Sequence, residues 1–205
     1  MSEKNVDFSR SQTRENLMRA FAGESQARNR YTIAAGVCRE SGLAVVQGVF
    51  LFTAEQERLH AQMFYQQLRE FDGQTIRVDG TYPVDLAKDP VSLLRAAQHN
   101  EWQEFEHDYA QFAAVAMEEG FPLVHKLFEN IGKVEQVHGE RFGRFADMLE
   151  RGELFVSNTE VQWMCLKCGY VVTATAAPAR CPVCHHEQGY FVRMELSPFA
   201  ENKNP

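Results

Sequence analysis

Two segments of the chain each place a glutamate and a histidine three residues apart. The first, EQERLH, contains Glu57 and His60, and the second, VEQVHGERF, contains Glu135 and His138. Residues i and i+3 lie on one face of an α-helix, so each pair presents a carboxylate and an imidazole side by side. One such pair is typical of a solvated helix surface. Two matched copies instead indicate ligands for a metal such as iron or manganese, which suits oxygen and imidazole donors.

Three further glutamates lie at positions that match these two pairs. The interval from Glu24 to Glu57 nearly equals the interval from Glu101 to Glu135, and Glu104 follows Glu101 after one helical turn. Each interval fits one helical hairpin, and two hairpins packed with pseudo-twofold symmetry would aim all these groups at one point. Burying so many ionisable groups without partners is prohibitive, whereas two metal cations would balance them. The pattern is that of dimetal carboxylate sites in four-helix bundles.

The cysteines indicate a second kind of metal site. Cys165 with Cys168 and Cys181 with Cys184 form two Cys-x-x-Cys pairs, which together offer a tetrahedral thiolate cage for zinc or iron. Spacing alone leaves both metals open, because a zinc ribbon has the same pattern. Cys38 makes the count odd, which argues against a disulfide framework, and we interpret it as a small buried hydrophobe.

Four long helices are needed to position the glutamates and histidines. Hydrophobic periodicity and capping signals predict helices over 11–40, 43–71, 90–119 and about 122–151. Short turns join the first helix to the second and the third to the fourth, whereas residues 72–90 are rich in Gly, Asp and Pro and form a long crossover. One long crossover is the connectivity of ferritin-like bundles rather than of simple up-and-down bundles.

The sequence changes character after the fourth predicted helix. Residues after Gly152 are rich in β-branched and aromatic types, Pro and Gly, and they show no helical period. We therefore expect a bundle domain over 1–151, a linker over 152–160 and a small β-rich domain over 161–205. The fold class is mainly α, with the β-rich, metal-binding domain following the bundle.

Composition and charge limit the classes of binding partner that the protein could have. The 205 residues carry a net charge of −7, which argues against nucleic acid or an anionic membrane surface. The N-terminus lacks the apolar core of a signal peptide. The longest apolar stretch, 43–54, is interrupted by Gln47 and is shorter than the ~20 residues of a membrane span. We expect a soluble cytoplasmic protein without membrane contact.

Taken together, the two Glu-x-x-His pairs and the segments CLKCGY and CPVC resemble the rubrerythrin family over nearly the whole chain. Rubrerythrins resemble ferritins in the bundle but carry one additional glutamate, and Glu104 stands where that glutamate belongs. The resemblance implies a rubredoxin-like C-terminal domain and three iron ions per chain. It assigns the dinuclear site to Glu24, Glu57, His60, Glu101, Glu104, Glu135 and His138, and the single iron to Cys165, Cys168, Cys181 and Cys184.

Other residues acquire roles by the same resemblance. Glu57 and Glu135 would bridge the two irons, and Tyr31 and Tyr109 would hydrogen-bond the carboxylate ligands. Asp108 departs from the family pattern, since many relatives have methionine at this position. This difference puts in doubt the polarity of the pocket near the dinuclear site. Trp163, Tyr170 and Phe191 would form the aromatic core of the rubredoxin-like domain. His99, His107, His125, His185 and His186 are interpreted as surface or satisfied histidines rather than ligands.

The function that the resemblance implies is a non-haem diiron peroxidase in oxidative-stress defence. Hydrogen peroxide would be reduced to water, with Glu104 carrying protons and leaving the metal on reduction as His60 takes its place. Electrons would come singly through the tetrathiolate iron from an NAD(P)H-dependent reductase or a rubredoxin, because the chain lacks a Gly-x-Gly-x-x-Gly fingerprint. A head-to-tail homodimer or a larger assembly is expected.

Two other functions compete with this one. A ferroxidase or iron-storage protein would oxidise Fe(II) as its substrate, but a storage shell needs no four-cysteine relay and no additional glutamate. An adaptor built from a helical bundle and a zinc ribbon would leave the matched carboxylates unexplained.

Overall fold

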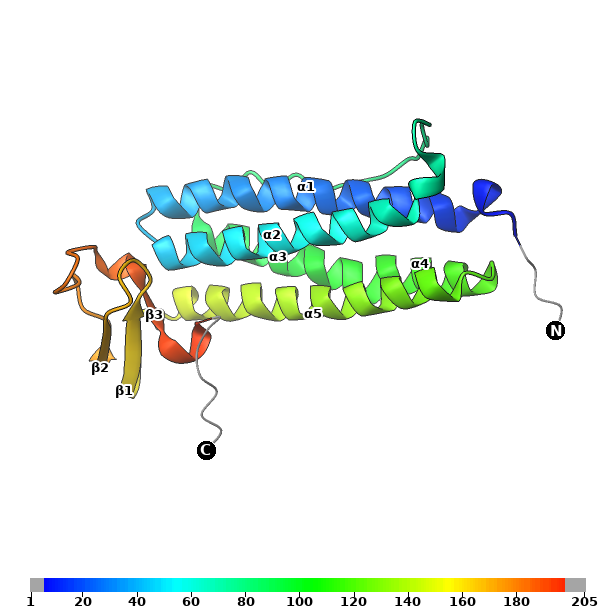
Figure 1. Ribbon diagram of the computed structural model, residues 1–205. Coiled ribbons are helices and arrows are strands. Elements are labelled where there is room, and N and C mark those ends of the chain that lie inside the picture. The colour runs from blue at the N-terminus through cyan, green and yellow to red at the C-terminus, as the bar shows by residue number, and fades with distance from the viewer. Residues whose placement is uncertain (1–5, 198–205) are drawn as a thin grey trace.

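Within residues 6–197, five α-helices, two of which continue one another through a π turn, build an elongated four-helix bundle with a small sheet domain at one end (Figure 1). The computed structural model describes residues 6–197, so the ends of both predicted domains, at 1–5 and 198–205, lie outside the described residues. The helices are α1 (Gln12–Glu40), α2 (Ala44–Gln67), α3 (Pro90–Gln103), α4 (Tyr109–Glu118) and α5 (Pro122–Glu150). The second helix ends before the predicted residue 71, because a 3-10 turn, Arg69–Phe71, follows it.

The third predicted helix is interrupted by a π-helical turn. Residues Glu104–Asp108 join α3 to α4, and the amide of Tyr109 donates to the carbonyl of Glu104. In a regular α-helix Tyr109 would lie about 80° away from the face of Glu101, and the residue added by the π turn returns it to that face. Periodicity did not reveal the turn, because one added residue barely disturbs an apolar pattern.

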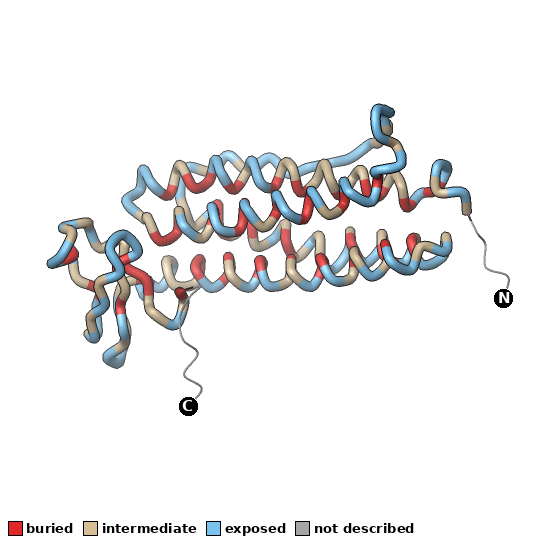
Figure 2. Tube along the Cα trace, in the orientation of Figure 1, coloured by how far each residue is buried: buried red, intermediate tan, exposed pale blue. Residues whose placement is uncertain are grey.

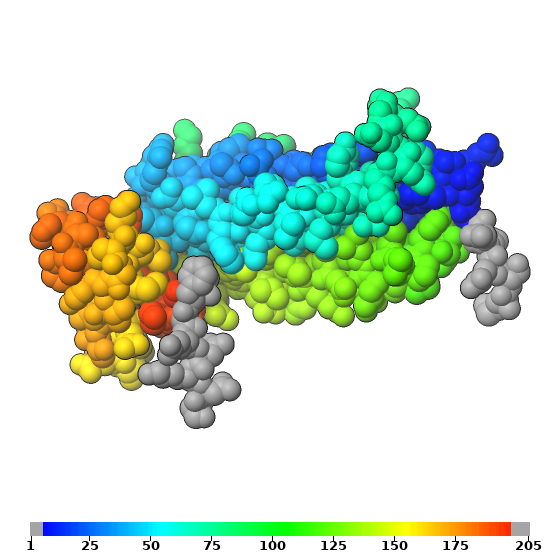
Figure 3. Space-filling view, viewed as in Figure 1, coloured from blue at the N-terminus to red at the C-terminus, as the bar shows by residue number. Residues whose placement is uncertain are grey.

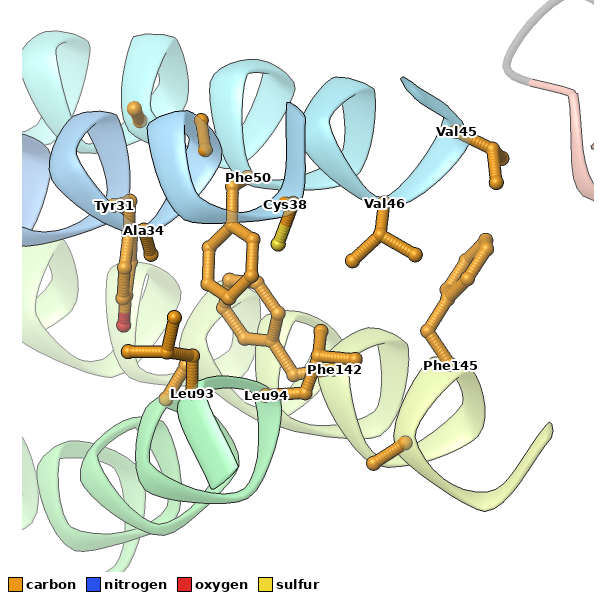
Figure 4. Close-up of a cluster of buried hydrophobic side chains, with 14 of the residues drawn as sticks. Tyr31, Ala34, Cys38, Val45, Val46, Phe50, Leu93, Leu94, Phe142 and Phe145 are labelled. Atoms are coloured by element: carbon orange, nitrogen blue, oxygen red, sulfur yellow. The ribbon is translucent and has the colours of Figure 1, made fainter. Parts of the chain in front are cut away.

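The helices meet along two apolar clusters, and Figure 2 shows buried positions on the inward faces. One cluster includes Tyr31, Phe50 and Phe142, and the rings of Phe50 and Phe142 lie 5.1 Å apart between centroids (Figure 4). The other includes Phe64 and Phe128, whose ring centroids are 5.0 Å apart. The Glu-x-x-His segments of α2 and α5 lie between these two clusters, so apolar layers close the site at both ends.

The crossover, residues 72–89, runs along α1 without regular structure beyond its first turn. Two ion pairs hold it to that helix: Arg19 with Asp79 at 2.6 Å and Arg30 with Asp85 at 2.7 Å. The chain thereby passes from the first hairpin to the second, as the sequence predicts for a bundle with one long crossover.

The C-terminal domain is a three-stranded antiparallel sheet in the order β2-β1-β3. Its strands are β1 (Val156–Cys165), β2 (Val171–Ala176) and β3 (Phe191–Arg193). Trp163 and Phe191 are buried in its core and Tyr170 packs against them, as expected. Strand β1 starts inside the predicted linker 152–160, and the domain boundaries themselves stay a prediction.

This domain packs on the turn between α1 and α2 (Figure 3). A Cβ atom added at Gly189 would lie 1.8 Å from the carbonyl oxygen of Gly42, so only glycine allows this close approach. Val192 and Leu196 from the domain also join the apolar cluster of the bundle. The sheet domain and the bundle therefore share a tight contact.

Candidate metal centres

Six of the seven predicted acidic and imidazole ligands meet inside the bundle. Each has an exposed fraction of 6% or less, and they come from four helices: Glu24 on α1, Glu57 and His60 on α2, Glu101 on α3, and Glu135 and His138 on α5. Their donor atoms form two groups, one of Glu24, Glu57, His60 and Glu135 and one of Glu57, Glu101, Glu135 and His138, and within each group all lie within 4.8 Å of one another. Two adjacent metal positions would therefore share Glu57 and Glu135.

The shared glutamates have the geometry of bridging carboxylates. One oxygen of Glu57 lies 3.0 Å from His60 Nδ1, and its other oxygen lies 2.9 Å from His138 Nδ1. The two oxygens of Glu135 divide in the same way, at 3.0 Å and 2.8 Å. Glu101 Oε2 lies 3.7 Å from His138 Nδ1, consistent with a terminal ligand beside one metal.

Buried polar atoms without hydrogen-bond partners test whether metal ions fit. Within the described residues these atoms include Glu24 Oε2, Glu57 Oε1, Glu101 Oε2, both carboxylate oxygens of Glu135 and Nδ1 of His138. Such orphaned atoms are rare and unfavourable in folded proteins. Two cations ligated by carboxylate oxygen and imidazole nitrogen would satisfy all of them, so the residues fit a dinuclear iron site.

Burial and neighbouring charges shift the pKa values of the cluster. Burial and the nearby Glu57 raise the pKa of Glu101 to about 8. Burial would lower the pKa of His138, but the neighbouring carboxylates of Glu101, Glu135 and Glu57 raise it to about 12. Burial would likewise lower the pKa of His60, but Glu135 and Glu57 raise it to about 9. Metal ions would replace the protons of these groups, because metal ligands must be deprotonated.

Two buried tyrosines each hold one terminal glutamate. The Tyr31 hydroxyl donates to Glu101 Oε1, and the Tyr109 hydroxyl donates to Glu24 Oε1. In both glutamates the other oxygen, Oε2, is the one without a partner. Each tyrosine therefore fixes its carboxylate and leaves one oxygen for a metal, although a catalytic role for Tyr31 and Tyr109 stays a prediction.

A polar network that sequence reasoning missed anchors His138. The Gln56 amide oxygen lies 3.1 Å from His138 Nε2 and accepts a hydrogen bond from Arg141 at 2.9 Å. Arg141 also donates to Thr53 at 2.8 Å. Because arginine only donates, the Gln56 atom must be the oxygen, and His138 Nε2 must carry the proton. Nδ1 is thereby left to face the carboxylates as a ligand atom.

Glu104 lies beside the cluster and belongs to neither group of close donor atoms. It starts the π turn, it is partly buried, and it lines a cavity of about 600 Å³ together with Asp108 and Tyr109. Burial, followed by the charge of Glu101, raises its pKa well above the ordinary value. The departure at Asp108 thus adds a carboxyl group to the cavity wall, and whether Glu104 ligates a metal stays a prediction.

The four clustered cysteines form the second candidate centre. Sγ of Cys165 lies 3.7 Å from Sγ of Cys184, and Sγ of Cys168 lies 3.6 Å from Sγ of Cys181. A tetrahedron with metal–sulfur bonds of about 2.3 Å has sulfur–sulfur edges of about 3.8 Å, so the cage matches one metal ion. Burial opposes ionisation of Cys181, but the backbone amides of Cys184 and Val183 lower its pKa to about 7.

Residues that the sequence set aside stay outside both centres. Neither metal group among the described residues includes His99, His107, His125 or Cys38. Nδ1 of His125 lies 2.9 Å from the Ala113 carbonyl oxygen. Cys38 is fully buried in an apolar cluster, where burial raises its pKa to about 12, as expected for a small hydrophobic residue.

A four-helix bundle with a buried pair of carboxylate-bridged metal positions, followed by a tetrathiolate domain, defines a ferritin-like dimetal protein with a rubredoxin-like extension. Comparison with protein families is more specific. The rubrerythrin family model matches residues 15–146, and the model of the rubrerythrin rubredoxin-like domain matches residues 163–192. The chain belongs to the rubrerythrin family.

Individual relatives span nearly the whole chain. A rubrerythrin of Clostridium perfringens is 41% identical, with 87% of this chain and 92% of that protein covered. A rubrerythrin of Porphyromonas gingivalis is 39% identical, with 96% of each covered. A nigerythrin structure in the fully reduced, all-ferrous state has 25% identity and a TM-score of 0.61 over 94% of each chain.

These findings confirm the predicted family and fold class, a ferritin-like four-helix bundle followed by a rubredoxin-like domain. Membership of the family makes the chain an oxidoreductase, and its two candidate centres are consistent with three iron ions per chain. Across residues 6–197, no helix combines the length and the apolar character needed to cross a membrane. A cytoplasmic location stays a prediction.

Proposed function

We propose that this protein is a peroxidase that reduces hydrogen peroxide to two molecules of water, using two electrons and two protons. The observation that carries the proposal is the position of Glu104, which lines a cavity beside the candidate dinuclear site and belongs to neither group of close donor atoms. When bound, the two irons of the dinuclear site would supply one electron each to the oxygen–oxygen bond. Ferritin-type iron storage has no need of this additional carboxyl group.

Glu104 supplies protons in this scheme. Burial, followed by the charge of Glu101, raises its pKa well above the ordinary value, which favours the protonated carboxyl group as a proton donor to a departing oxygen. Tyr31 and Tyr109 keep Glu101 and Glu24 in place while the charge of the site changes. The cavity gives Glu104 a path for taking up the next proton from solvent.

The tetrathiolate domain relays electrons from an external donor. Cys168 is the exposed member of the cage, so an NAD(P)H-dependent reductase or a rubredoxin would approach there. Within one chain the domain covers the end of the bundle at the α1–α2 turn, away from the mid-bundle cluster. A head-to-tail homodimer would bring the domain of one copy towards the dinuclear site of another.

Cys168→Ser tests the relay. The variant should keep its bundle and one rapid oxidation of the reduced dinuclear site by peroxide, because that step needs no outside electron. Steady NAD(P)H-dependent peroxide consumption with an added reductase should fall to background. Cys38→Ser is the control, since Cys38 lies in the apolar core of the bundle.

Two results would count against the proposal. If the Cys168→Ser variant kept its steady turnover, the tetrathiolate centre would not be the electron relay. Oxidation of many equivalents of added Fe(II), with ferric iron retained and no faster reaction with peroxide than with dioxygen, would favour the ferroxidase alternative.

A further inference from the structure

A roofed cavity leads from the surface to the Glu104 side of the cluster. Its walls come from α1, the crossover and the π turn, and its volume is about 600 Å³. Of the seven candidate ligands only Glu104 lines it, and Tyr109, which holds Glu24, lines it as well. The cavity therefore touches the dinuclear site at the one carboxyl group that stands apart from the two metal groups.

Tyr82 of the crossover forms the roof. Its hydroxyl donates to the backbone carbonyl of Arg19 at 3.2 Å. Gly80 makes room for the tyrosine, because a Cβ atom there would lie 2.8 Å from the Tyr82 hydroxyl, and the ring also lies against Gly23, where a Cβ atom would be in ordinary contact with Tyr82 Cε1 at 3.8 Å. Gly23 immediately precedes Glu24. The tyrosine ring thus lies over the segment of α1 that enters the cluster.

Two ion pairs hold the crossover to α1, one on either side of Tyr82 in the sequence. Arg19 pairs with Asp79 at 2.6 Å, three residues before Tyr82. Three residues after it, Asp85 pairs with Arg30 at 2.7 Å and accepts from Asn100 at 2.9 Å. Tyr82 itself is 42% exposed and lines the cavity, so it is in contact with both solvent and the cavity.

The walls suit a small polar molecule that donates and accepts hydrogen bonds. They include Gln26, Asn100, Gln103 and Asp108. A second cavity, of about 610 Å³, contains Gln56 and Arg141 but none of the seven candidate ligands. It approaches His138 only through Gln56, so it offers a less direct route.

We propose that the cavity under Tyr82 is the access route for hydroperoxide, and that Tyr82 sets its size limit, admitting hydrogen peroxide and excluding bulky organic hydroperoxides. The proposal rests on the peroxidase function proposed above. Tyr82 is thus a specificity-determining residue on the crossover, far in sequence from the metal ligands.

Two opposite variants test the route. Tyr82→Ala removes the roof, and Gly23→Leu fills the space beneath it. Val84→Ala is the control, because Val84 is 81% exposed on the same crossover and does not line the cavity. Circular dichroism and metal content establish that each variant folds and loads.

Two readouts are compared. The first is the ratio of the rates at which cumene hydroperoxide and hydrogen peroxide oxidise the reduced iron-loaded protein. The second, independent of turnover, is the rate at which azide binds the cobalt-loaded protein, followed by its colour. Tyr82→Ala should raise the ratio by at least about tenfold, the scale on which a pocket discriminates by size. Gly23→Leu should slow azide binding severalfold, and Val84→Ala should match the wild type.

Wild-type values of both readouts in Tyr82→Ala would overturn the route, and this partly exposed position leaves little reason for misfolding. If the wild type reacts no faster with hydrogen peroxide than with dioxygen, the peroxidase proposal fails instead. Azide binding would still report on the route in that case, so the two failures are distinguishable.

Discussion

At the residue scale, the two histidines of the cluster are held differently. His138 is fixed through Nε2 by Gln56, which Arg141 orients in turn. For His60, the hydrogen bond among the described residues involves Nδ1, on the side of the carboxylates. The asymmetry fits the expectation that His60 moves on reduction while His138 stays in place, and this movement stays a prediction.

Gln56→Leu should weaken metal binding while leaving the fold intact. Without the Gln56 oxygen, the proton on His138 Nε2 loses its acceptor and the ring loses its fixed orientation. Affinity of the dinuclear site should fall by about 10–100-fold, the usual effect of removing such a partner. Competition with a chelator measures this. Gln62→Leu, at an exposed position on the same helix, is the control. Equal affinity in the two variants would exclude an anchoring role.

Six of the acidic and imidazole candidates could be proposed from the sequence because their spacing repeats, whereas Glu104 has no counterpart on the first helix and was assigned by the family resemblance. Gln56 and Arg141 could not be found in this way, since neither residue has a counterpart at the matching position of the other hairpin. A signal was nevertheless present, because Arg141 follows His138 by one helical turn and shares its face.

At the element scale, the π turn of Glu104–Asp108 keeps two functional positions in phase. It returns Tyr109 to the face of Glu101, and from there Tyr109 reaches Glu24. The sequence predicted the helix over 90–119 but not this turn. An α-helix and an α-helix with one inserted residue have nearly the same composition and periodicity, so only the backbone distinguishes them.

Deleting Glu106 tests this phase argument. The deletion should convert the π turn into regular helix, and about seven residues make two turns, so Tyr109 should still face the cluster. We expect helix content and dinuclear metal content close to the wild type. Deleting Asn130, an exposed residue in the regular helix α5, is the matched control. It should rotate one end of α5 by about 100° relative to the other and lower metal content sharply. Similar losses in both deletions would refute the argument.

At the scale of the whole molecule, the position of the C-terminal domain depends on one close contact. Gly189 approaches the Gly42 carbonyl at a distance that leaves no room for a side chain. The sequence predicted the domain, its four cysteines and its aromatic core. It did not predict where the domain sits, because a contact between two glycines leaves no hydrophobic or charge pattern.

Gly189→Ala should loosen the domain from the bundle. The added methyl group would overlap the Gly42 carbonyl, and such overpacking destabilises by about 1–3 kcal/mol. We expect faster proteolytic cleavage between α5 and β1, with the absorbance of the tetrathiolate iron retained. Gly36→Ala is the control, because a Cβ atom there meets nothing within 4 Å. Unchanged cleavage in Gly189→Ala would show that the contact does not hold the domain.

The central claim is that peroxide oxidises the dinuclear site and that electrons follow from the tetrathiolate iron. Stopped-flow absorbance of the anaerobically reduced, iron-loaded protein mixed with hydrogen peroxide, with dioxygen as the comparison oxidant, tests it most directly. The account predicts rapid oxidation of the dinuclear site by peroxide, slower oxidation by dioxygen, and then the red absorbance of oxidised tetrathiolate iron. A reaction no faster with peroxide than with dioxygen, or a tetrathiolate iron that stays reduced after the dinuclear site is oxidised, would contradict it.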